Sequence, residues 1–167
     1  VVADVQPAAV AELTSVGAAA AATPREVAAV SDIVITMLPD APDVLRVALG
    51  DDGVVAGIKP GAVYIDMSTI DPQTTRTVGS AIAAKGAAMI DSPVGKTADA
   101  AVAGTLTLMV GGDADVVARC RPVLDCMSTD FFHCGGLGTG QTMKLVNNLL
   151  VAINIAGGNP TVPVGDT

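Results

Sequence analysis

The sequence predicts an α/β fold in which helices pack against a mostly parallel sheet. Its 167 residues suffice for one domain with a substantial core, and half of them are hydrophobic. Short apolar runs alternate with segments of helical periodicity, an order typical of strand–helix–strand units. Only 2% of the residues are aromatic, whereas Ala, Val and Gly are abundant, which suits helices packed closely on buried strands.

Strands are predicted where β-branched and other apolar residues cluster. The clearest run, 33–38, is nearly continuous, as in a parallel sheet buried on both faces, and Pro39 ends it. Shorter runs predict further strands at 1–5, 18–21, 62–67, 87–90 and 106–110.

Helices are predicted between these runs from the spacing of apolar residues. They cover 7–14, 24–31, 42–49, 71–85 and 113–127, and a long helix begins near Gly140. The helix at 24–31 has the best-marked start, because Thr23 can cap it, Pro24 takes its first position and Glu26 completes a capping box. The end of the chain, 157–167, loses all periodicity, and we expect an irregular tail there.

Composition and charge exclude several classes of function. The 17 acidic and 9 basic residues give a net charge of -8, which argues against nucleic acid and anionic membrane surfaces as partners. No apolar run reaches the roughly 18 residues of a membrane span, and the first residues do not resemble a signal peptide. Cys120, Cys126 and Cys134 fit no disulfide or zinc pattern, and His133 lacks partners for a metal site. We therefore expect a cytoplasmic protein without a metal, whose cysteines are reduced and mostly fill the core.

Polar residues follow the predicted strands at the edge where open α/β sheets bind ligands. Asp4 could accept hydrogen bonds from the ribose hydroxyls of a dinucleotide, or it could be a surface acid. Ser68 and Thr69 could line a ligand, or they could cap the helix that follows. In the next loop, Gly95 permits a close backbone approach, and Lys96 either adds a cation for an anionic substrate or is an ordinary solvated lysine.

The strongest local feature is the glycine-rich segment 135–140, which leads into a helix carrying Lys144, Asn147 and Asn148. These polar side chains stand among Leu, Val and Met, and would be costly to bury without partners. The helix therefore indicates a polar site. The glycine-rich segment does not match the pattern of a phosphate-binding P-loop.

In their order and spacing, these segments resemble the β-hydroxyacid dehydrogenases, the group of 3-hydroxyisobutyrate dehydrogenase and tartronate semialdehyde reductase. The resemblance covers about 1–155. It rests on Asp4 at a strand end, Met37-Leu38-Pro39, Asp66-Met67-Ser68-Thr69, Asp91-Ser92-Pro93-Val94, Gly104-Thr105-Leu106, Met109-Val110-Gly111-Gly112 and Gly138-x-Gly140-x-x-x-Lys144-x-x-Asn147-Asn148. The segment Pro93-Val94-Gly95-Lys96-Thr97 departs from the common Pro-Val-Ser-Gly-Gly and is closer to the Pro-Val-Gly-Arg-Thr of sulfolactaldehyde reductases.

The resemblance implies a Rossmann-like, doubly wound sheet and a role for each matching residue. It implies a partial NAD-binding domain over 1–137, the start of a long interdomain helix over 138–156, and the tail at 157–167. Lys144 would be the catalytic general acid. The cofactor NAD(H) would contact Asp4, Met37, Leu38, Pro39 and Thr69, and the substrate would contact Gly95, Lys96, Thr97, Asn147, Asn148 and Val151.

The resemblance also implies an activity. It is NADH-dependent reduction of a short anionic aldehyde to the alcohol, with 3-sulfolactaldehyde preferred and 2,3-dihydroxypropane-1-sulfonate as the product. The alternatives are tartronate semialdehyde reductase, 3-hydroxyisobutyrate dehydrogenase and, in another class, a non-catalytic nucleotide-binding fragment.

Family members begin with a strand and a Gly-x-Gly-x-x-Gly loop, and continue past the lysine helix into a helical domain. We therefore expect the chain to be a fragment whose sheet is incomplete at its N-terminus. We also expect the isolated chain to bind NADH poorly and to be inactive. The full-length protein would be a homo-oligomer.

Overall fold

The computed structural model describes residues 1–157, so that the predicted tail, apart from Gly157, lies outside the described residues. The elements follow in the order α1 (Pro7–Ser15), α2 (Pro24–Val30), β1 (Ile33–Thr36), α3 (Ala41–Leu49), α4 (Val54–Gly57), β2 (Val63–Asp66), α5 (Pro72–Ala83), β3 (Ala88–Asp91), β4 (Val94–Gly95), α6 (Ala98–Ala103), β5 (Leu106–Gly111), α7 (Ala114–Leu124), β6 (Ser128–Gly135) and α8 (Thr139–Ala156).

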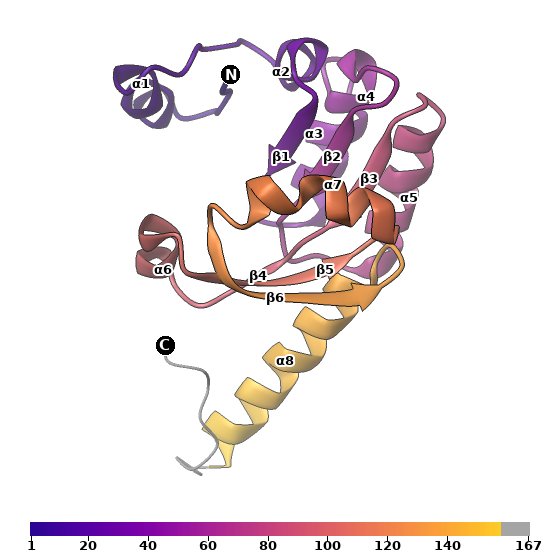
Figure 1. Ribbon diagram of the computed structural model, residues 1–167. Helices are drawn as coiled ribbons and strands as arrows, with labels where there is room; N and C mark the ends of the chain where they lie inside the picture. The colour runs from indigo at the N-terminus through magenta and orange to yellow at the C-terminus, as the bar shows by residue number, and fades with distance from the viewer. Residues whose placement is uncertain (158–167) are drawn as a thin grey trace.

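A six-stranded sheet forms the centre of the described structure (Figure 1). β1, β2 and β3 are paired in parallel in that order, and β6 is parallel to β5. Two short antiparallel contacts complete the sheet, one between β3 and β5 and one between β4 and β5. The predicted mostly parallel α/β sheet is therefore confirmed.

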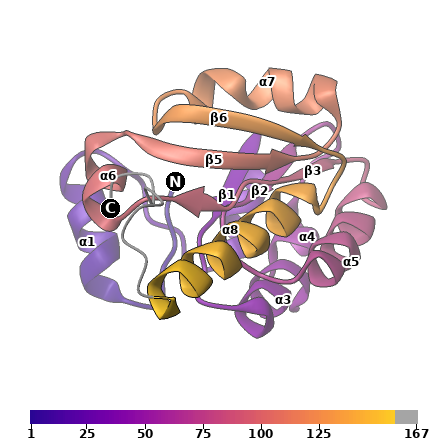
Figure 2. The ribbon, with the colours of Figure 1, turned by 90° about the horizontal axis from the view of Figure 1, so that it is seen from below.

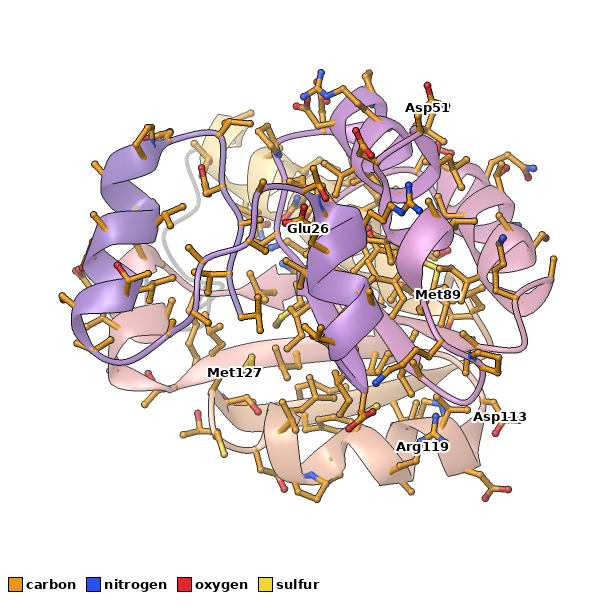
Figure 3. All side chains as sticks on the ribbon, turned by 90° about the horizontal axis from the view of Figure 1, so that it is seen from above. Glu26, Asp51, Met89, Asp113, Arg119 and Met127 are labelled. Atoms are coloured by element: carbon orange, nitrogen blue, oxygen red, sulfur yellow. The ribbon has the colours of Figure 1, made fainter. Side chains whose placement is uncertain are left out.

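Helices cover both faces of this sheet, as Figure 2 shows for α7 on one side and α3, α4 and α5 on the other. Side chains alternate along β2, so that Tyr64 joins the core beneath α2 to α5, whereas Ile65 joins the core beneath α7. Cys120 and Leu124 of α7 are fully buried in that second core. Asp113 and Arg119, labelled in Figure 3, mark the start and the middle of α7. The doubly wound arrangement is thus confirmed.

The predicted cap of α2 is present. Thr23 Oγ1 accepts a hydrogen bond from Glu26 N (3.2 Å), and Glu26 Oε2 accepts one from Ala22 N (2.8 Å). The glutamate, labelled in Figure 3, therefore reaches back to the residue before the cap, whereas in a capping box it would bind the N–H of the cap residue Thr23.

The predicted strands near the N-terminus are largely absent. Of 1–5 and 18–21, only a single parallel bridge between Val2 and Ala20 forms. The run at 33–38 is a strand only to Thr36, and it is not buried on both faces, since Ile35 is 39% exposed. The cause is its position: within residues 1–157, β1 is paired on one side only, and α7 packs over β3 and β6 rather than over β1.

Some elements were not predicted, above all β6. Half of its residues, Ser-Thr-Asp-Phe-Phe-His-Cys-Gly, are polar and its burial does not alternate, so the usual strand signal is weak. The short elements α4, β4 and α6 were also not expected. The expectation that the cysteines mostly fill the core holds for Cys120 alone, because Cys126 is exposed and Cys134 is only partly buried.

α8 leaves the sheet at a steep angle and extends away from the domain (Figure 1). Only Gly140 and Gln141, in its first turn, are buried. Large apolar side chains are exposed along the rest of it, namely Met143, Leu145, Val146, Leu149, Leu150, Ile153 and Ile155. No helix in the described part of the chain combines the length and hydropathy needed to cross a membrane.

Candidate functional site

The three parallel strands β1, β2 and β3 end in register. Thr36 lies beside Asp66, and Asp66 lies beside Asp91. The loops that carry the predicted cofactor residues leave the sheet directly after these positions, and Leu38 N donates a hydrogen bond to Ser68 Oγ (2.9 Å). The structure thus brings the 37–39 and 68–70 loops together at the carboxyl edge of the sheet, where ligands bind in such folds.

A buried carboxyl group, that of Asp66, organises these two loops. Its Oδ1 accepts hydrogen bonds from Thr36 Oγ1 (3.0 Å), Ser68 N (3.2 Å) and Ser68 Oγ (2.6 Å). Its Oδ2 is buried and has no hydrogen-bond partner among residues 1–157. Burial raises the pKa of Asp66, and burial together with the nearby Asp66 charge raises the pKa of Tyr64, whose hydroxyl lies 2.7 Å from Thr36 Oγ1.

Two further buried polar residues fasten the start of α8 to the sheet and to the 68–70 loop. Asp91 Oδ1 accepts a hydrogen bond from Gly138 N (2.6 Å), and Asp91 Oδ2 accepts one from Gln141 N (2.8 Å). The Gln141 side chain donates from Nε2 to Ser68 O (2.7 Å) and accepts at Oε1 from Ile70 N (3.0 Å). Burial raises the pKa of the Asp91 carboxyl group, although these two backbone donors act in the opposite direction.

Sequence reasoning did not single out Asp66, Asp91 or Gln141 as site residues. A usable signal existed for each of them. Both aspartates end apolar strands, and Gln141 precedes Lys144 by three residues, which places it on nearly the same side of a helix.

Lys144 lies one turn beyond Gln141 and is half-buried. Burial lowers the pKa of its ammonium group. Asn147 and Val151 are also partly buried, at the spacing of one helical face, whereas Asn148 is exposed. The predicted polar face on this helix therefore centres on Lys144 and Asn147, with Asn148 beside it.

Lys96 is engaged by the protein itself. Its Nζ donates to Asp130 Oδ2 (2.8 Å), Thr105 O (2.8 Å) and Thr129 Oγ1 (3.3 Å), which uses all three donors of an ammonium group. The contact with Lys96 lowers the pKa of Asp130. Lys96 is also the one non-glycine residue with positive φ (75°) among the described residues. In this arrangement the ammonium group is held by the protein itself, and the contact of Lys96 with a substrate stays a prediction.

The neighbours of Lys96 and the remaining cofactor candidates differ in exposure. Gly95 is buried, and a side chain there would press on Thr107, whereas Thr97 is exposed. Asp4 is exposed, and its Oδ1 accepts a hydrogen bond from Gln6 N (2.7 Å), so it forms a local turn instead of ending a regular strand. Met37, at 62% exposed, and Pro39 are open to solvent at the carboxyl edge, with Thr69 partly buried nearby.

No group of three or more metal-ligating side chains lies together within residues 1–157. Residues 1–136 match the family described as the NAD binding domain of 6-phosphogluconate dehydrogenase.

Among curated proteins, the chain is similar to a 3-hydroxyisobutyrate dehydrogenase of Pseudomonas aeruginosa. The two are 42% identical over 162 residues, which cover 97% of this chain and 54% of that protein. It is also similar to an NAD-dependent L-serine dehydrogenase of the same organism, at 40% identity over 92% of this chain and 51% of that protein. The chain therefore spans about half the length of the curated relatives it matches.

Solved structures give the same result. The Mycobacterium tuberculosis 3-hydroxyisobutyrate dehydrogenase, solved with L-serine, matches with a TM-score of 0.86 at 37% identity, over 92% of this chain and 52% of that one. The 3-hydroxyisobutyrate dehydrogenase of Salmonella typhimurium matches with a TM-score of 0.85 at 34% identity, over 93% of this chain and 54% of that one.

Proposed function

The chain belongs to the family of the NAD binding domain of 6-phosphogluconate dehydrogenase. We propose that the protein is an NAD-dependent β-hydroxyacid dehydrogenase. The observation that carries the proposal is the half-buried Lys144, on a helix whose first turn is fastened to the 68–70 loop at the carboxyl edge of the sheet. A lysine kept partly out of water beside a ligand-binding edge is expected at a site of proton transfer. A non-catalytic module would have no need of it.

The carboxyl edge is proposed to hold the nicotinamide part of the cofactor. Met37 and Leu38 offer an apolar surface, and Thr69 offers a hydroxyl and backbone groups beside it. When bound, the dinucleotide supplies or accepts the hydride. Asp4 is proposed to contact the adenosine ribose, and its exposed carboxylate would need to exchange its contact with Gln6 N for one with the ribose.

Lys144 is proposed to hold the proton that is exchanged with the substrate oxygen. In the direction of reduction, its ammonium group gives a proton to the carbonyl oxygen and stabilises the negative charge that develops there. Partial burial lowers the pKa of Lys144, which brings it closer to the working pH of a proton donor. Asn147, Asn148 and Val151, further along α8, are proposed to orient the substrate.

The substrate is proposed to be a short β-hydroxyacid of the 3-hydroxyisobutyrate or L-serine type, as the names of the relatives suggest. Its carboxylate would meet the backbone around Gly95 and Thr97. The engagement of Lys96 by Asp130 supports this choice over a sulfonate, because the ammonium group has no donor left. The second candidate, 3-sulfolactaldehyde, is favoured by the presence of a cation in this loop and requires Lys96 to leave Asp130.

The test is a comparison of initial rates with the intact gene product. NAD⁺ reduction is measured with 3-hydroxyisobutyrate and L-serine, and NADH oxidation with sulfolactaldehyde and tartronate semialdehyde, with NADP(H) as the cofactor control. In the direction of reduction, we expect kcat/KM for tartronate semialdehyde, which carries a carboxylate, to exceed that for sulfolactaldehyde by about 10-fold or more. A clear preference for sulfolactaldehyde would contradict the proposed substrate and indicate that Lys96 binds the sulfonate group. Inactivity with all four substrates would overturn the proposed function.

A further inference from the structure

Gln141 joins two parts of the proposed site through one buried side chain. Its amide makes a pair of hydrogen bonds, one to Ser68 O and one from Ile70 N. These two backbone groups flank Thr69, so that both sides of this residue are fastened to α8. Gln141 is fully buried, which makes the two hydrogen bonds difficult to replace by water.

Asp91 holds the same helical turn from the other side. Both of its carboxylate oxygens accept from backbone N–H groups of the 138–141 segment, and Asp91 itself is fixed at the end of β3. The turn is therefore attached to the sheet through its backbone and to the 68–70 loop through its side chain. Lys144 follows after three residues, about 4.5 Å further along the helix. A tilt of this turn would move the Lys144 ammonium group relative to Thr69.

We propose that Gln141, supported by Asp91, is a positioning residue that sets the place of the Lys144 ammonium group relative to the 68–70 loop. The inference rests on the proposed function, because the position of Lys144 affects the reaction only if Lys144 donates a proton and the 68–70 loop binds the cofactor. A purely structural role would only alter the amount of folded protein. A positioning role changes the chemistry of the folded enzyme.

The first test replaces Gln141 with Met in the intact gene product. Gln141→Met has nearly the same volume but leaves Ser68 O and Ile70 N without partners. The matched control is Gln73→Met, which changes an exposed glutamine on α5. We expect kcat of Gln141→Met to fall about 10²-fold while KM changes little, since a displacement near 1 Å can cost that much.

The pH dependence separates positioning from stability. Loosening of the first turn admits water to Lys144 and raises its pKa, so the alkaline fall of kcat for reduction should move to higher pH in Gln141→Met. A loss of stability alone lowers the fraction of folded enzyme and leaves the pKa of Lys144 within the folded enzyme unchanged. Gln141→Glu should restore activity towards acid pH only, because the neutral acid can still donate to Ser68 O whereas the carboxylate cannot.

A second measurement needs no activity. Competitive acetylation of the lysines across a pH series, quantified by mass spectrometry, gives the pKa of Lys144 directly. We expect a value below the ordinary 10.5 in the wild type and in Gln73→Met, and an increase in Gln141→Met. If the wild type turns over no substrate but the increase is seen, the proposed function fails and the positioning of Lys144 stands. If Gln141→Met matches Gln73→Met in both the labelling and the pH profile, the inference is overturned.

Discussion

Asp66 shows how a single buried residue can hold the ligand-binding edge together at a cost in stability. One of its oxygens accepts three hydrogen bonds, one from Thr36 at the end of β1 and two from Ser68 in the loop after β2, and the other has no partner among the described residues. Burial raises the pKa of this carboxyl group, so the folded state favours its protonated form. The same residue therefore orders the loops and makes the fold less stable when it is ionised.

The pH dependence of stability tests this interpretation. Because the pKa of Asp66 is higher in the folded state, the folded protein binds more protons than the unfolded chain, and its stability rises as the pH falls. We expect the free energy of unfolding of the wild type, relative to Asp66→Asn, to increase from neutral pH towards the ordinary aspartate pKa of 3.8. Urea denaturation at several pH values measures the difference.

Asp71 provides a control with the opposite sign. It is exposed, and hydrogen bonds from Thr74 lower its pKa, so that the wild type should lose stability relative to Asp71→Asn as the pH falls through the ordinary aspartate pKa of 3.8 and below it. A constant difference between wild type and Asp66→Asn across the pH range would show that the Asp66 carboxyl group is not perturbed.

At the scale of elements, the docking of α8 on β5 depends on two glycines. A side chain at Gly140 would overlap with Met109 O, and one at Gly111 would overlap with Asp91 Oδ1 and crowd Gly140 N. The close approach is what allows Asp91 to reach both Gly138 N and Gln141 N. This gives a physical reason for the second glycine of the Gly138-x-Gly140 pattern before the lysine.

Gly140→Ala should therefore destabilise the protein by about 1–3 kcal/mol, as overpacking of a close contact does. Gly136→Ala is the matched control, because a side chain there meets nothing within 4 Å, and its effect should stay within about 0.5 kcal/mol. Thermal and urea unfolding of the two variants and of the wild type measure these changes in the free energy of unfolding. If Gly140→Ala were as stable as the wild type, α8 could move away from β5 without a loss of stability, and the docking would not depend on this glycine.

At the scale of the whole molecule, local patterns predicted most of the architecture. The strands at 62–67, 87–90 and 106–110 and the helices at 71–85 and 113–127 were found within a few residues, because each carries its own periodicity and caps. The strand β6 was missed because half of its residues are polar and its apolar residues do not alternate with them. The N-terminal strands failed for another reason: strand formation needs a partner, and the described residues provide Val2 with only a single bridge.

The same distinction holds for the candidate site: local patterns predicted its loops and its helix, but not the contacts between residues far apart in the sequence. The loops after the strands and the lysine helix were predicted, since they stand at fixed places in an α/β fold. The hydrogen bond between Lys96 and Asp130 was not predicted, because Asp130 lies 34 residues away, on the strand β6 that sequence reasoning missed. Gln141 and Ser68, which meet across 73 residues, are a similar case. The interdomain position of α8 stays a prediction, and the apolar side chains exposed along it are consistent with such a place.

The most direct test is steady-state and single-turnover kinetics of Lys144→Ala in the intact gene product. The control is Lys85→Ala, which changes an exposed lysine in the turn after α5. We predict that Lys144→Ala folds normally, binds NADH with an affinity close to that of the wild type, and loses about 10² or more in kcat, as expected for a general acid. Lys85→Ala should match the wild type. Retention of wild-type kcat by Lys144→Ala would contradict the proposed mechanism.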